Sequence, residues 1–88
     1  MEANNNHNTN MNKEIRSKAE AIAKDFALSI KERTDALLKL DTEMYMELGK
    51  DTTKKEKKEV KQTSKYIFKQ LKGFNESDAE MLLRALDE

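Results

Sequence analysis

The residues of this chain with the greatest capacity for chemistry are carboxylates, and a few of them are spaced as a pair. Glu43 and Glu47 are four residues apart, so they lie on one face of a helix, and Asp41 lies not far round it. Paired carboxylates can bind a divalent ion or act as general acid and base. However, no Cys or Gly-rich loop accompanies them, and the one His, His7, lies in a polar segment. We therefore expect no enzymatic activity, no metal and no cofactor.

A second chemically suggestive pattern is a row of lysines at helical spacing. The row consists of Lys54, Lys58, Lys61, Lys65, Lys69 and Lys72. At 100° per residue these side chains cover an arc of about 60–80°. Residues 54–72 hold eight Lys against two Glu, a net charge of +6, whereas residues 73–88 hold five acids against one Arg, a net charge of −4.

The lysine row has two interpretations. The simpler one is a solvated helix face, because Lys keeps exposed helices soluble. The functional one is an electrostatic surface for nucleic-acid phosphates or for an acidic protein, since each phosphate contact releases counterions. The row contains no Arg or Asn for base edges, which argues against sequence-specific recognition of DNA.

These charges must be positioned by helices, and the longest candidate covers residues 13–48. The segment contains no Gly and no Pro before Gly49, and its apolar residues recur at helical spacing. One stripe contains Ile15, Ala19, Ile22, Phe26, Ile30, Leu37, Leu40, Met44 and Leu48. The pattern predicts one helix of about 54 Å, or two nearly collinear helices that meet near Asp41 and Thr42. Arg33 lies within the stripe and would have to snorkel or find a partner.

The flanking segments complete the predicted architecture. Residues 1–12 form an Asn-rich polar tail that we expect to be disordered, with Asn12 as the N-cap of the first helix. Gly49 is the predicted end of that helix. Residues 13–88 then make a single helical domain, because 88 residues allow one domain at most.

Two capping-box patterns predict the helices that follow. Thr53 with Glu56 begins a second helix that runs to about Lys72, where Gly73 ends it. Its predicted apolar edge is Val60, Ser64, Ile67 and Leu71. Ser77 with Glu80 begins a short third helix over residues 78–86, which must dock on another helix, most simply the first, because it is too short to persist alone.

The resulting fold class is all-α: a long N-terminal helix, an antiparallel second helix and a short C-terminal helix, as a three-helix bundle or a helical hairpin. Zero net charge gives no bulk attraction to nucleic acid or membrane. No apolar run approaches the roughly 18 residues of a membrane span, and the first residues lack the features of a signal peptide. We therefore expect a cytoplasmic protein with no membrane partner.

The expected function is non-catalytic binding to another protein, as a regulator, inhibitor or assembly factor. A long first helix would have an apolar side that its two followers cover incompletely, which favours a homodimer or a larger, coiled-coil-like assembly. The predicted protein interface consists of Leu28, Met44, Met46 and Leu48. The alternative function is binding of nucleic acid through the lysine row.

Overall fold

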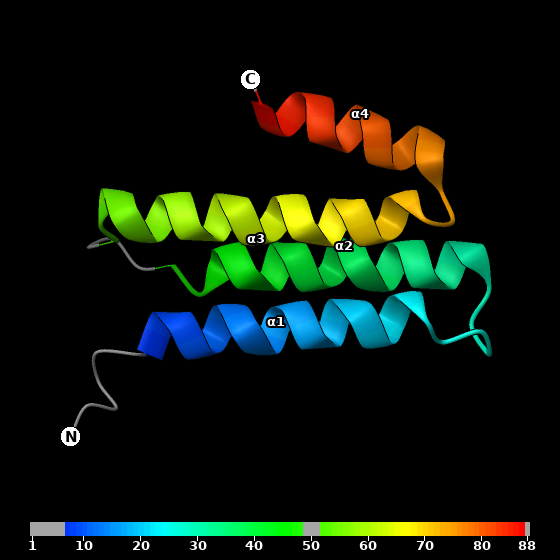
Figure 1. The fold of residues 1–88 in the computed structure, drawn as a ribbon, viewed down its shortest axis with the longest axis horizontal. Coiled ribbons are helices and arrows are strands. Elements are labelled where there is room, and N and C mark those ends of the chain that lie inside the picture. The colour runs from blue at the N-terminus through cyan, green and yellow to red at the C-terminus, as the bar shows by residue number, and fades with distance from the viewer. Residues whose placement is uncertain (1–6, 49–51, 88) are drawn as a thin grey trace.

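The computed structural model describes residues 7–48 and 52–87, which form helices and no strand, so the prediction of an all-α fold is confirmed for these ranges. The helices are α1 (His7–Ala23), α2 (Ile30–Met46), α3 (Lys54–Lys72) and α4 (Glu76–Asp87). Successive helices run in opposite directions, and α1, α2 and α3 all pack against one another (Figure 1). Among the described helices α4 packs on α3, on the side away from α1 (Figure 1), so the expected docking on the first helix is wrong.

The predicted continuous helix over residues 13–48 is wrong, because the chain reverses between Ala23 and Ile30. Helices α1 and α2 are antiparallel neighbours, and Asp41 and Thr42 lie inside α2 with no break between them. The reversal has a local cause. Ser29 forms a capping box with Glu32: the Ser29 hydroxyl accepts from the Glu32 N–H, and the Glu32 carboxylate accepts from the Ser29 N–H. This box starts α2 without Gly or Pro, six residues after α1 ends at Ala23.

The N-terminal boundary also differs from the predicted one. Helix α1 begins at His7, so residues 7–12 of the predicted tail are helical and Asn12 is not an N-cap. The side-chain carbonyl oxygen of Asn12 instead accepts a hydrogen bond from the Thr63 hydroxyl of α3 at 3.1 Å. Residues 1–6 of the tail and the predicted helix end at Gly49 lie outside the described residues.

The core lies between helices of similar length. Helices α1 and α2 have 17 residues each and α3 has 19, so each can cover the apolar side of the others. The buried apolar side chains are Ile15, Ala19, Leu37, Leu40, Met44, Val60, Ile67, Phe68, Leu71 and Ala79. The excess length that favoured a dimer is therefore not present in this fold.

Helix α3 agrees closely with its prediction. It begins after Thr53, whose capping box with Glu56 has both hydrogen bonds, and Gly73 is its C-cap. The predicted edge is buried: Val60, Ser64, Ile67 and Leu71. Because a short polar residue sits in that edge, α2 and α3 also share a hydrogen bond, from the Ser64 hydroxyl to the Asp41 carboxylate at 2.6 Å.

Helix α4 begins two residues earlier than predicted, and the capping box of Ser77 with Glu80 is not what starts it. Asn75 precedes the helix; its side chain accepts from the Asp78 N–H at 3.4 Å and donates to the Asp78 carboxylate at 3.0 Å. The Asn75 amide also donates to the Thr34 hydroxyl of α2 at 3.0 Å. The α3–α4 turn is thereby attached to α2 near the end where the chain reverses between α1 and α2.

Candidate protein-binding surface

The carboxylates that could do chemistry do not meet. Asp41 turns toward α3, where burial raises the pKa of its carboxyl above the usual value and the hydrogen bond from Ser64 partly opposes that shift. Glu43 and Glu47 are exposed. No group of three or more His, Cys, Asp or Glu side chains within residues 7–48 and 52–87 is placed to hold a metal ion.

The residues of the predicted interface lie in different environments. Met44 is 1% exposed and belongs to the core, and Leu48 is half-buried against the same core. Met46 is 76% exposed at the end of α2. Leu28 is half-buried and lies before the start of α2, at the opposite end of that helix from Met46. These residues therefore do not form one continuous surface.

The most exposed large apolar side chains near Leu28 are two that the helical stripe assigned to the core. Phe26 is 79% exposed and Ile30 is 52% exposed. Phe26 lies in the α1–α2 turn, residues 24–29, and Ile30 is the first residue of α2. The stripe is correct for the other residues of α1 and α2. It fails here because Phe26 and Ile30 keep the helical spacing in the sequence while the chain turns, so the spacing no longer places them on a buried face.

The α1–α2 turn is held in one conformation by local hydrogen bonds. The Asp25 carboxylate accepts from the Ala27 N–H at 3.1 Å, and the Asp25 carbonyl accepts from the Leu28 N–H at 3.1 Å. The capping box of Ser29 and Glu32 fixes the other side of the turn. Phe26 is thus presented to solvent by an ordered turn.

Arg33 is buried next to this turn and contacts residues on both sides of it. Its side chain is 8% exposed, and its guanidinium lies 5.2 Å from the Phe26 ring centroid and 4.7 Å from that of Phe74. Its Nη1 donates to the carbonyl of Ala23, the last residue of α1, at 3.3 Å. A buried cation against two aromatic faces replaces the carboxylate partner that a buried arginine would otherwise need. The α1–α2 and α3–α4 turns are therefore joined through one side chain.

The arrangement suits binding to a protein better than it suits chemistry. An exposed Phe in the turn, followed by an exposed Ile at the first residue of α2, offers an apolar anchor, and aromatic anchors dominate many protein interfaces. Because the turn is already ordered, little conformational entropy is lost on docking. The helical stripe gave no sign that Phe26 and Ile30 are surface residues, although Ser29-x-x-Glu32 is the same kind of pattern that located α3.

The lysine row lies on the solvent side of α3. Five of its six side chains are exposed, and Lys65 is half-buried. The row is a continuous basic strip about 28 Å long, given the 19 residues of α3. The strip and the α1–α2 turn consist of different residues, so substitutions can test them one at a time.

Comparison with models of protein families, with curated proteins and with solved structures found no match to this chain. Among the described helices, none combines the length and the apolar character needed to cross a bilayer. The function is therefore inferred from the geometry of the protein's own residues.

Proposed function

We propose that this protein is non-catalytic and acts by binding another protein, into which it docks the α1–α2 turn. The observation that carries the proposal is the pair Phe26 and Ile30, which are 79% and 52% exposed on a turn fixed by its own hydrogen bonds. The partner presents an apolar depression that accepts the Phe26 ring. Such contact fits a regulator, an inhibitor or an assembly factor.

The exposed apolar side chains of the turn are not explained by its structural role alone. Phe26 contacts Arg33 through one face of its ring, but most of its surface and about half of that of Ile30 stay in solvent, where apolar side chains raise the risk of aggregation. The buried Arg33 holds one face of the Phe26 ring, which leaves the other face open. Both features are explained if a partner covers the turn.

The test is site-specific photocrosslinking in the native host. Phe26 is replaced by p-benzoylphenylalanine, and a matched control carries the same group at Tyr45, an aromatic residue of α2 that is 38% exposed. We expect a discrete protein adduct from position 26 and a much lower yield of that adduct from position 45. Ile30→Ser in the labelled chain should reduce the yield because Ile30 belongs to the same surface. No adduct from position 26, or an equal adduct from both positions, contradicts the proposal.

A second candidate function is binding of nucleic acid through the lysine row. The exposed basic strip along α3 favours it. Nucleic acid should then show a mobility shift, and the logarithm of the association constant should fall with the logarithm of the salt concentration with a slope of about −0.9 per phosphate contacted. The quadruple variant K58E/K61E/K65E/K69E should abolish this shift. Phe26→Ala should leave that shift unchanged. If the native chain binds neither duplex nor single-stranded nucleic acid at about 50 mM salt, the row is only a solvated helix face.

A further inference from the structure

A shallow groove lies between α1 and α3, next to part of the lysine row. It is lined by polar side chains from both helices: Asn12, Lys13, Arg16, Glu59 and Gln62. At 100° per residue, Lys58 and Lys69 of the row lie within about 40° of Gln62 around α3. Lys55 lies about 20° from Gln62 and adds a third exposed lysine to this side of the helix. Exposed lysines of α3 therefore border the α1–α3 groove.

Cations stand on both sides of the α1–α3 groove. Lys13 and Arg16 are exposed on α1, opposite the three exposed lysines of α3. The acids beside them are Glu59, which lines the groove, and Glu20, which follows Arg16 by one helical turn on α1. Five cations therefore stand against two carboxylates, and this balance favours an anionic ligand.

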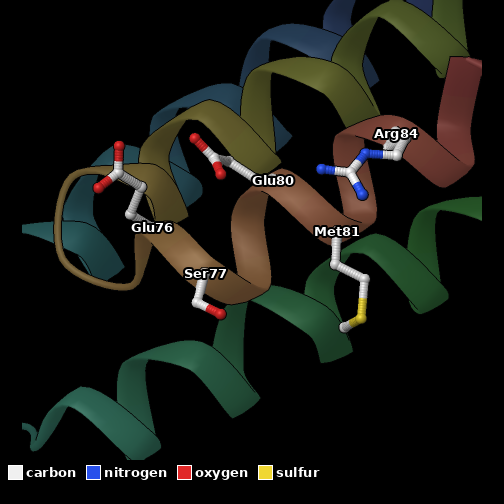
Figure 2. A pocket seen from close by; sticks show the side chains of 5 residues that line it. All are labelled: Glu76, Ser77, Glu80, Met81 and Arg84. Carbon is white, nitrogen blue, oxygen red and sulfur yellow. The ribbon is translucent and has the colours of Figure 1, made fainter.

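The opposite side of α3 is acidic, because α4 packs there. Helix α4 lies on the side of α3 away from α1 (Figure 1), and it carries one Arg against four acids, Glu76, Asp78, Glu80 and Asp87. Figure 2 shows the Glu76 and Glu80 carboxylates together on one edge of α4, with Met81 pointing the opposite way. An anionic chain that lies along α3 is therefore repelled on the α4 side and attracted on the α1 side.

The groove also contains a flat surface on which a nucleic-acid base can stack. The Arg16 guanidinium lies over the Tyr66 ring, 5.5 Å from its centroid, and the Tyr66 hydroxyl donates to the Glu20 carboxylate. Because Arg16 is exposed, a base can reach the guanidinium from the solvent side. Unpaired bases stack on aromatic rings and on Arg guanidinium planes, whereas the bases of a duplex are already stacked on one another. The stack therefore favours a single strand.

We propose that the α1–α3 groove binds single-stranded nucleic acid. Phosphates contact Lys55, Lys58 and Lys69, and one base stacks on the Arg16 guanidinium. From Lys55 to Lys69 the lysines extend over about 21 Å of helix, enough for several phosphates. Stacking accepts every base, so binding is largely independent of sequence. This inference rests on the second candidate function, for which it names the form of nucleic acid and the side of α3 that is used.

The test is fluorescence anisotropy of the full chain with a labelled oligothymidylate of about twelve nucleotides at about 50 mM salt. An abasic strand and a duplex of the same length are the comparison probes. The native chain should bind the oligothymidylate about tenfold more tightly than the abasic strand, because only the former can stack on Arg16. For about three phosphate contacts, the logarithm of the association constant should fall with the logarithm of the salt concentration with a slope of about −2.

Arg16→Lys separates stacking from charge, because Lys keeps the positive charge but lacks the planar guanidinium. It should weaken binding of the oligothymidylate about tenfold and leave binding of the abasic strand unchanged. Arg84→Lys is the matched control on α4 and should change neither. Lys58→Gln should weaken binding of both probes and reduce the salt slope by about 0.7. All three residues are exposed, so far-UV circular dichroism should show that each variant keeps the fold.

The outcomes distinguish this proposal from the functions proposed above. If the native chain binds no nucleic acid, the groove and the second candidate function are both wrong, and the crosslinking test at Phe26 is unaffected. If the abasic strand or the duplex binds as tightly as the oligothymidylate, or if Arg16→Lys changes nothing, only the single-strand groove is wrong. Polyglutamate of the same length that competes equally well would mean that the groove accepts any polyanion, an acidic protein included, and it would also overturn the proposal.

Discussion

Replacing Arg33 with Met should lower stability only slightly, although the guanidinium is buried and contacts both turns. The native side chain has two opposing contributions. It gains from the Phe26 and Phe74 rings and from the hydrogen bond to the Ala23 carbonyl, but its Nε is buried without a hydrogen-bond partner. Met keeps most of the volume and removes the buried charge together with its unpaired donor.

The magnitude follows from these contacts. Two cation–π contacts contribute about 1.5 kcal/mol together, and a long hydrogen bond contributes about 1 kcal/mol. Removing the buried Nε–H, which has no hydrogen-bond partner, should stabilise the folded state by about 2 kcal/mol. Arg33→Met should therefore cost about 0.5–1 kcal/mol. Arg33→Ala should cost about 2 kcal/mol more, because it also removes roughly three buried carbon-sized groups.

The assay is urea denaturation followed by far-UV circular dichroism at pH 7, with hydrogen exchange as a local measurement. We expect the backbone amides of Ala27 and Leu28, which donate to Asp25, to exchange faster in Arg33→Met, because the turn loses the contacts that the guanidinium makes with it. If Arg33→Met is as unstable as Arg33→Ala, then the charge, and not the packing of the side chain, holds the two turns together, and our reasoning is wrong.

Three further predictions concern the core and the caps. Phe26→Ala should cost about 2 kcal/mol: about 1 kcal/mol because about a fifth of a ring surface of roughly 200 Å² is covered, and about 0.75 kcal/mol for the lost cation–π contact with Arg33. Phe68→Ala should cost about 3–5 kcal/mol; thermal denaturation compares the two variants, and similar losses would show that Phe26 belongs to the core. Ser29→Ala should cost about 0.5–2 kcal/mol in urea denaturation by removing the N-cap of α2, with exposed Ser17→Ala as the near-neutral control. Asp41→Asn should raise the urea midpoint at pH 7, because the amide still accepts from Ser64 without a buried charge. Burial raises the pKa of Asp41 in the folded protein above 3.8, so the native chain loses stability as pH rises from that value through the folded pKa. The gain in stability of Asp41→Asn over the native chain should therefore shrink toward pH 4, and a gain that grows on acidification would refute this sign.

Local signals in the sequence located much of this fold. The capping box of Thr53 and the apolar edge of α3 are correct to the residue, because both depend on neighbours within one helical turn. The stripe over residues 13–48 also marks the buried sides of α1 and α2 correctly. It could not show the reversal between them, since the apolar residues of two antiparallel helices keep the same period when the turn also contains apolar residues.

The candidate surface escaped sequence analysis for the same reason. Phe26 and Ile30 continue the period, so only the capping pattern of Ser29 distinguishes an exposed turn from a buried helix. Capping patterns are not sufficient either, because Ser77 and Glu80 match one and do not start α4. Asn75 takes that position through its contacts with Asp78 and with Thr34, and the second of these depends on tertiary packing.

The reversal of the chain at residues 24–29 supports the proposed binding surface, because it places Phe26 and Ile30 outside the core. Lys18 of α1 and Glu43 of α2 line the same surface depression, and the chain contains no Cys, so spin labels attached at positions 18 and 43 of the double variant K18C/E43C would report this reversal directly. Pulsed electron–electron double resonance should give a distance of about 20 Å or less between the two spin labels, as expected for adjacent helices with flexible labels. A distance of about 38 Å, the separation of 25 residues along a continuous helix, would contradict the fold and the binding surface together.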